Sequence, residues 1–313
     1  MEDLVFGPVP SRRLGKSIGV NNIPHKVCSY SCAYCQVGKG DKIQVMRQEF
    51  YKPEILVKQI ENKLNKLNQH DYPDYITIVS DGEPTLDINL GKLITCIKKL
   101  GIPVAVITNS SLLHLETVRE ELSLANYVSL KIDTVNAHTW KHINKPHKSL
   151  LLNQTLDAIL AFTQHYTGQC VTETMLVKDV NTSDSELSGT AQFIKLFKPN
   201  IAYISIPTRP PAFEGTLPPL EETLLRAHET FSWHCLNTEL LTGYEGNTFV
   251  STGNFYNDLL SITAVHPMRI DAVKELMAKT NATEESLKKL IDSNVVKQLS
   301  YERQTYIVRC FKK

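Results

Sequence analysis

Short apolar runs alternate with amphipathic stretches along most of the chain. Runs rich in β-branched and aromatic residues predict strands at 17–22, 75–80, 103–108, 127–132, 170–177 and 201–207. Most of these runs are almost continuously apolar, as in strands covered on both faces. Apolar residues at helical spacing predict helices at 53–68, 88–101, 149–165, 183–197 and 219–235. The alternation of strand and helix indicates an α/β fold with a parallel sheet and right-handed crossovers.

About six such strand–helix units suit a partial or full β/α barrel. An open doubly wound sheet is the alternative, because both folds repeat the same strand and helix unit. Helix boundaries carry their own signals: Pro53 stands in the first turn of one helix, and Gly101 follows the lysines that end another.

The pattern changes after about residue 245. Three short helical stretches, at 254–267, 269–280 and 283–294, precede two strands around a polar turn in 295–311. This order of elements resembles a winged helix. We therefore predict two domains, a β/α barrel in residues 1–245 and a small winged-helix-like domain in residues 246–313.

Composition narrows the possible partners. The chain has 313 residues with a net charge of +1, so no global field attracts nucleic acid or a membrane surface. The N-terminus has no signal-peptide pattern and no apolar run is long enough to cross a bilayer, so we expect a cytoplasmic protein without a membrane partner. In that compartment clustered cysteines point to metal or redox chemistry instead of disulfides.

Three cysteines lie close together in the stretch HKVCSYSCAYCQ, as Cys28-x3-Cys32-x2-Cys35. Three thiolates can hold three irons of a [4Fe–4S] cluster and leave the fourth iron open to a small chelating ligand. The alternative is a zinc ion with His25 as its fourth ligand.

This spacing, with the aromatic Tyr34 before the last cysteine and a strand before the loop, resembles the signature of the radical S-adenosylmethionine (SAM) superfamily. The opening GPVPSRRLGKSIGVNNIPHKVCSYSCAYCQVG resembles a subgroup related to wyosine-type tRNA-modifying Fe–S oxidoreductases. The resemblance implies a barrel of the radical SAM type. It also implies a [4Fe–4S] cluster on Cys28, Cys32 and Cys35, with SAM on the open iron.

A second motif follows the strand at 75–80. Asp81-Gly82-Glu83-Pro84 resembles the Gly-Gly-Glu-Pro motif of the superfamily, with Asp81 in place of the first and more permissive glycine. The resemblance implies that carbonyls near Gly82 and the carboxylate of Glu83 accept hydrogen bonds from the SAM ammonium group. A simple turn is the alternative, since Asp, Gly and Pro all favour turns.

Polar residues at the ends of later strands extend the candidate SAM site. Two-residue alternation puts the polar side chains of the strand at 127–132 on one face. In the superfamily such positions hold the ribose hydroxyls and carboxylate of SAM, and Lys131 suits the carboxylate. For each of these residues, the alternative is a structural role in which the side chain makes hydrogen bonds at the end of a strand. The positions are Thr108, Asn109, Ser129, Lys131, Asp133 and Glu173.

Candidate substrate contacts lie in two proline-containing stretches. Arg12 and Arg13 precede the first predicted strand, and Arg209 follows the last one. Arginine on a stiff loop at a barrel mouth suits phosphate or carboxylate. The resemblance to the wyosine group implies an RNA or nucleotide substrate. The stretch YVSLKIDTVNAHTWKHINKP resembles glycyl-radical-enzyme activases, which implies a protein or peptide substrate, and both remain open.

The resemblance further implies an oxygen-sensitive enzyme that takes electrons from a donor such as flavodoxin or ferredoxin. It implies reductive cleavage of SAM to a 5′-deoxyadenosyl radical that abstracts hydrogen from the substrate. A different class of protein is the alternative: a zinc-binding winged-helix regulator whose basic C-terminal residues contact DNA phosphates. Those residues include Lys288, Lys289, Lys297, Arg303 and Arg309.

Overall fold

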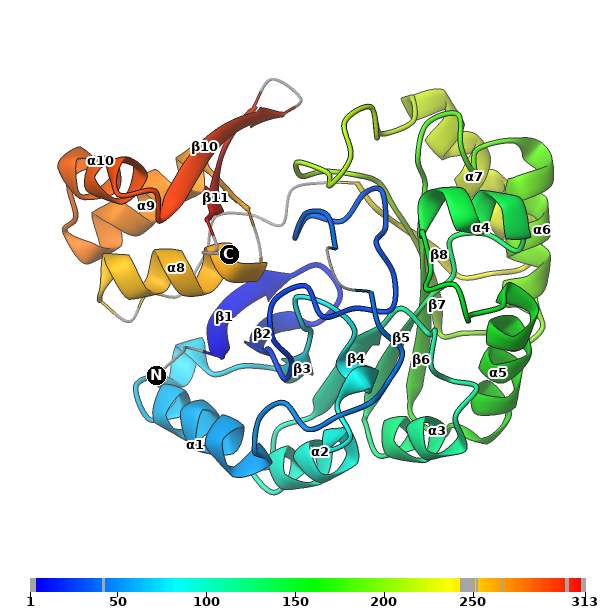
Figure 1. Ribbon diagram of the computed structural model, residues 1–313, viewed down its shortest axis with the longest axis horizontal. Helices are drawn as coiled ribbons and strands as arrows, with labels where there is room; N and C mark the ends of the chain where they lie inside the picture. Colours follow the sequence, from blue (N-terminus) through cyan, green and yellow to red (C-terminus); the bar gives the residue numbers. More distant parts are fainter. Residues whose placement is uncertain are drawn as a thin grey trace.

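An eight-stranded curled sheet forms the larger part of the protein (Figure 1). The structure is a computed structural model that describes residues 4–40, 43–242, 251, 253–265, 267–301 and 304–310. Strand β1 (Val5–Ser11) pairs antiparallel with β2 (Gly15–Val20), and every later neighbour in this sheet is parallel. The strands follow one another in chain order, and β1 and β8 form the two edges. The sheet is therefore an open, partial barrel.

All six predicted strands are confirmed, as β2 and as β3 to β7 in the list that closes this paragraph. Two strands were not predicted. In β1, Pro8 and Pro10 suggested a stiff loop, but proline is tolerated on an edge strand because no ladder hydrogen bond is lost there. Strand β8 is short and largely exposed, and its sequence TELL has no clear strand pattern. The remaining strands are β3 (Tyr75–Ile78), β4 (Val104–Thr108), β5 (Tyr127–Lys131), β6 (Gln169–Met175), β7 (Ile201–Ser205) and β8 (Thr238–Leu241).

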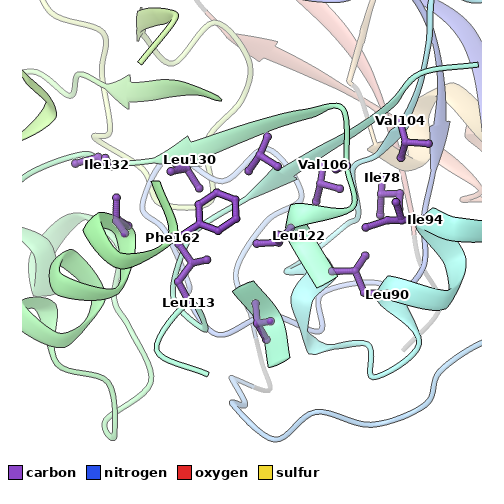
Figure 2. Packing of buried hydrophobic residues seen from close by; sticks show 14 of the residues in the cluster. Ile78, Leu90, Ile94, Val104, Val106, Leu113, Leu122, Leu130, Ile132 and Phe162 are labelled. Atoms are coloured by element: carbon purple, nitrogen blue, oxygen red, sulfur yellow. The ribbon is translucent and has the colours of Figure 1, made fainter. Parts of the chain in front are cut away.

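Six of the described helices pack on the outer face of the sheet, and the short α4 packs instead against the loop that carries Cys28 and Cys32 (Figure 1). The five predicted helices are confirmed with slightly shorter ends, whereas α3 and α4 were not predicted because they span only eight and seven residues. Figure 2 shows Leu90 and Ile94 of α2 and Phe162 of α5 packed toward strand residues such as Val106 and Leu130. The helices are α1 (Pro53–Leu64), α2 (Leu90–Lys98), α3 (Glu116–Ser123), α4 (Ala137–Ile143), α5 (Leu152–His165), α6 (Asp184–Lys195) and α7 (Glu221–Trp233).

The inner face of the sheet is apolar at the floor of the barrel and polar at its mouth. Tyr127, Val171 and Tyr203 form an apolar layer, and Leu14 from the turn between β1 and β2 packs into it. Four residues further along β5, at its carboxyl end, Lys131 faces the mouth, while Val128 and Leu130 point to the outer core. The alternation predicted for this strand is confirmed, and it concentrates polar groups at the carboxyl ends of the strands.

The C-terminal elements form a separate small sheet with helices. Their order is that predicted from the sequence, with one additional short strand. The boundary at 245–246 and Arg303 lie outside the described residues, so the domain division and the winged-helix assignment stay predictions. The elements are α8 (Phe255–Val265), β9 (Met268–Arg269), α9 (Ile270–Thr280), α10 (Glu284–Asp292), β10 (Val296–Tyr301) and β11 (Gln304–Arg309), with sheet order β10-β11-β9.

The small sheet shares its core with the barrel. Phe6 and Val9 of β1 pack in one cluster with residues such as Leu259 of α8 and Ile307 of β11 (Figure 1). Strand β1 therefore serves both parts of the molecule. Within the residues that the structure describes, no helix is long and apolar enough to cross a membrane.

We predict that Gly19→Ala lowers the free energy of unfolding by about 1–3 kcal/mol, the usual cost of overpacking a core. A Cβ at Gly19 lies 1.9 Å from Cζ of Phe6. Urea unfolding followed by circular dichroism measures the loss. Phe6→Leu in the same background recovers part of it by shortening the opposing side chain. Full wild-type stability of the single variant contradicts the predicted clash.

Candidate active site

The three motif cysteines line one cavity at the carboxyl ends of the strands. This cavity has a volume of about 300 Å³. Cys28, Cys32 and Cys35 are all partly buried, and all are unpaired thiols. The loop that carries them follows β2, so the parallel sheet delivers it to the edge where ligands bind in α/β folds.

The cysteine loop rests on the end of α4. The carbonyls of Ile143 and Asn144 accept hydrogen bonds from the backbone N–H groups of Ala33 and Ser31, at 2.7 and 3.1 Å. The rings of Tyr30 and Trp140 meet edge to face with centroids 5.8 Å apart. The last carbonyls of a helix lack partners within the helix, and here the loop supplies them.

The loop after β3 closes against the same cysteine loop. The N–H of Glu83 donates to the carbonyl of Val27 at 3.1 Å, and the N–H of Lys26 donates to the carbonyl of Asp81 at 2.9 Å. A Cβ at Gly82 lies only 1.8 Å from that Val27 oxygen, so this close approach requires glycine. The two sequence motifs are thus joined backbone to backbone.

Glu83 is completely buried, and its carboxylate is occupied within the protein. It accepts from Thr85 N and Oγ1 at 3.1 and 2.6 Å, from Thr108 Oγ1 at 2.6 Å and from Asn109 N at 2.7 Å. Burial raises the pKa of this carboxyl, and the hydrogen bonds oppose that rise. Neither Glu83 nor the buried Pro84 is among the residues that line the cavity. This placement suits support of Thr108 and Asn109, which do line it, better than the predicted direct contact with SAM.

Asp81 faces the cavity and has an unused acceptor. Its Oδ2 lies 3.2 Å from Nδ1 of His25 and 3.3 Å from Nδ2 of Asn21. Its Oδ1 is buried and has no hydrogen-bond partner among the described residues. Burial raises the pKa of Asp81, and His25 opposes the rise. The carboxylate that could accept from an ammonium group therefore belongs to Asp81, the residue that departs from the family motif.

Lys131, Glu173 and Arg13 form an ion cluster inside the barrel. Strand register pairs Lys131 with Glu173, and Lys131 Nζ donates to Glu173 Oε1 at 2.8 Å. Arg13 donates to Glu173 Oε2, and Ser205 Oγ donates to Oε1 at 2.9 Å. Burial disfavours every charge here, but Glu173 and Asp133 still raise the pKa of Lys131. Lys131 and Arg13 likewise hold the pKa of Glu173 well below its usual range.

Asp133 and Ser129 are buried and are not among the residues that line the cavity. The hydroxyl of Tyr34 donates to Asp133 Oδ2, and Lys131 Nζ lies 5.0 Å from the centre of the Tyr34 ring. The structure thus brings seven of the predicted SAM-site residues together in the cavity lining, whereas Asp133 and Ser129 lie outside it.

The three predicted substrate arginines, Arg12, Arg13 and Arg209, all line the cavity. Arg209 donates to Oε1 of Gln36, in the cysteine loop, at 2.7 Å. The C-terminal hairpin holds the preceding segment, because the hydroxyls of Tyr301 and Tyr306 donate to the carbonyls of Pro207 and Thr208 at 3.1 and 2.9 Å.

Other residues of the site were not predicted. Ser205 ends β7, which the sequence predicted to run on to residue 207, and the strand-end rule that selected Thr108 also applies to it. Lys26 and Gln36 flank the cysteines and line the cavity. Asn144 lies far from both motifs in sequence, and no sequence pattern marks it.

The thiols fit a multi-iron cluster better than one ion. Burial and neighbouring charge raise the pKa of all three, that of Cys32 to about 12, so their thiolate forms require a cation. Among the described residues, no three His, Cys, Asp or Glu side chains come close enough together to hold a single metal ion. His25, the predicted fourth zinc ligand, contacts Asp81. A [4Fe–4S] cluster binds each cysteine through a different iron, which suits thiols that do not converge on one point.

Comparisons with known proteins agree on the class. The family model described as "Radical SAM superfamily" matches residues 22–194. The UPF0026 protein MJ1312 of Methanocaldococcus jannaschii is 40% identical over 99% of this chain and 97% of its own length. A UPF0026 protein of Helicobacter pylori is 34% identical over 95% of this chain and 90% of its own. The chain belongs to the radical SAM superfamily.

Solved structures share the fold at low identity. A radical SAM methyltransferase from Sphaerobacter thermophilus superposes with a TM-score of 0.55 at 12% identity, covering 72% of this chain and 66% of that one. SuiB of Streptococcus suis bound to SAM has a TM-score of 0.52 at 14% identity, covering 71% of this chain and 49% of that one. This chain thus spans only part of each solved structure. As a superfamily member it is an iron–sulfur enzyme that uses a [4Fe–4S] cluster and SAM.

We predict that Glu83→Ala destabilises the protein as well as weakening SAM binding. Each buried donor left without a partner costs about 1–3 kcal/mol. Thermal unfolding and equilibrium dialysis of SAM measure the two effects, and iron content should stay near wild type. If SAM binding weakens while stability is unchanged, Glu83 contacts SAM directly and its supporting role is wrong.

We predict that Glu173→Gln lowers stability at neutral pH and that the difference from wild type shrinks on acidification. The folded pKa of Glu173 is depressed, so its contribution is full above the unfolded pKa, about 4.3. The contribution is lost as pH falls from there through the folded pKa. Urea unfolding from pH 7 to 3 measures it, with the exposed Glu229→Gln as control. A difference that is constant over this range refutes the ionic origin.

Proposed function

We propose that this chain binds one [4Fe–4S] cluster through Cys28, Cys32 and Cys35 and cleaves SAM reductively in the cavity beside them. When bound, the cluster supplies the electron that splits SAM into methionine and a 5′-deoxyadenosyl radical, which takes hydrogen from the substrate. The observation that carries the proposal is the common cavity of the three cysteines and the Asp81–Gly82 loop, which are joined by backbone hydrogen bonds.

Residues around the cavity have complementary tasks in this proposal. Oδ1 of Asp81 and the carbonyls near Gly82 accept from the ammonium group of SAM. Lys131, kept cationic by Glu173 and Asp133, attracts the SAM carboxylate. Thr108 and Asn109 offer polar groups at the end of β4, held from below by Glu83. The carboxylate of Glu173 orients both cations, because Lys131 pairs with one of its oxygens and Arg13 with the other.

The substrate we propose is an RNA or a nucleotide. Five cationic side chains and two acidic ones are among the described residues that line the cavity, which favours an anionic group on the substrate. The opening of the chain also resembles the wyosine-related subgroup. A protein or peptide substrate is the second candidate, supported by the stretch at 127–146 that resembles activases. The electron donor is a flavodoxin or ferredoxin.

The C-terminal unit, residues 246–313, supports one wall of the site from outside in this proposal. Its hairpin holds the segment before Arg209, and Arg209 contacts the cysteine loop. Helix α10, which carries two of the basic residues considered for DNA contact, has a Lys289–Glu285 ion pair at 3.0 Å on its exposed face. That pairing favours the supporting role of the unit over a DNA-binding role for this helix.

We predict that Cys32→Ala abolishes cluster assembly but retains the fold, because the cysteine is on a loop and outside the sheet. Anaerobic reconstitution followed by iron analysis and absorbance near ~400 nm measures assembly. Cys96→Ala, on α2 and remote from the motif, is the matched control and should assemble normally. Normal iron content in Cys32→Ala refutes the ligand assignment.

The substrate test uses the assembled wild-type protein. Incubated anaerobically with SAM and a reductant, it should form 5′-deoxyadenosine, and added cell RNA should increase the amount formed. A rise with ribonuclease-treated protein extract instead selects the peptide alternative. No 5′-deoxyadenosine from cluster-loaded protein under any condition contradicts the proposed reaction.

A further inference from the structure

Asn144 occupies a junction between the cysteine loop and the sheet. It caps the C-terminus of α4 and is 2% exposed. Its side-chain Nδ2 lies 3.5 Å from Sγ of Cys32, 3.3 Å from the hydroxyl of Tyr34 and 2.7 Å from Oδ2 of Asp133. The amide therefore directs N–H groups at a cysteine sulfur and at the residues beside it.

The backbone holds this amide in place. The N–H of Asn144 donates to Trp140 O at 2.9 Å within α4, and its carbonyl accepts from Ser31 in the cysteine loop. At its other end α4 begins at the cap residue Asn136, whose Oδ1 accepts from His138 N at 2.9 Å. Because helix α4 and the cysteine loop both fix the backbone of Asn144, its amide stays directed at the sulfur and loses little further conformational entropy.

A second amide makes the same contact with another cysteine. Nδ2 of Asn109, at the end of β4, lies 3.6 Å from Sγ of Cys28 and 2.9 Å from Oγ of Ser29. The N–H of Asn109 is bound to Glu83, which fixes the side chain above the loop. Two separate elements thus each present a side-chain amide to a different sulfur.

We propose that Asn144, together with Asn109, raises the reduction potential of the cluster bound by the cysteines. This inference rests on the proposed function. Reduction adds negative charge that is shared by the cysteine sulfurs, and N–H···S bonds strengthen as that charge grows. Such bonds therefore stabilise the reduced form, and hydrogen bonds to sulfur are one of the means by which proteins set these potentials. Asn144 and Asn109 are positioning residues for electron uptake.

The test is an anaerobic redox titration of the reconstituted protein, followed by electron paramagnetic resonance of the reduced cluster. Asn144→Leu keeps the volume and removes both donors, while Asp133 retains its bonds from Tyr34 and from Met175 N at 2.8 Å. We expect iron content equal to wild type and a midpoint potential below wild type. At the wild-type midpoint, the reduced fraction of the variant falls below one half.

Two further variants separate the sulfur contact from other effects. Asn109→Ala should lower the midpoint in the same direction, and it acts at Cys28 through an amide whose other partner is Ser29 instead of Asp133. Asn136→Ala weakens the N-terminal cap of α4 without touching a sulfur, so its midpoint should equal that of wild type.

If Asn144→Leu loses the cluster, the Asn109→Ala titration decides alone. The inference is overturned if Asn144→Leu and Asn109→Ala assemble the cluster and have the wild-type midpoint potential. It is also overturned if Asn136→Ala shifts the midpoint as much as Asn144→Leu does, because the effect then belongs to helix α4. In both cases 5′-deoxyadenosine formation by the wild type leaves the proposed function standing. A wild-type protein that binds no cluster overturns the proposed function and this inference together.

Discussion

The site depends on one close backbone approach, that of Gly82 to Val27. A side chain at position 82 lies within 1.8 Å of the Val27 carbonyl, so no other residue permits this contact without displacement. The approach lets the N–H of Glu83 donate to the carbonyl of Val27 and the N–H of Lys26 donate to the carbonyl of Asp81, which joins the two loops. Because one loop carries the cysteines and the other carries Asp81, their relative position follows from this contact.

Charge is organised around the same contact. Glu173 lies between the cationic Lys131 and Arg13, and Asp81 lies beside the imidazole of His25, so both acidic groups that face the cavity have basic partners. Glu83 differs, since hydroxyl and backbone donors satisfy it entirely. A buried carboxylate without a cation is stable only when its oxygens are fully hydrogen bonded, and its role here is to tie the ends of β3 and β4 together.

The open barrel leaves β1 as an edge, and the C-terminal unit packs beside it. Phe6 joins the core of that unit, and Gly19 leaves room for its ring. Through Tyr301 and Tyr306 the same unit reaches the segment before Arg209. An element far along the chain therefore supports one segment of a cavity whose lining residues all come from the first two thirds of the sequence.

The sequence by itself determined the strand and helix order and the two motifs, because these depend on local periodicity and on residue spacing. Periodicity left a barrel and an open doubly wound sheet as alternatives. The alternation in β5 also placed Lys131 on the inner face correctly. It did not reveal β1, whose prolines hide an edge strand, or the short helix α4. Only the tertiary structure decided that Glu83 supports the site, that Asp81 offers the unused oxygen and that Asn144 meets Cys32. Those outcomes depend on burial and on contacts between segments up to 112 residues apart, which no local pattern encodes.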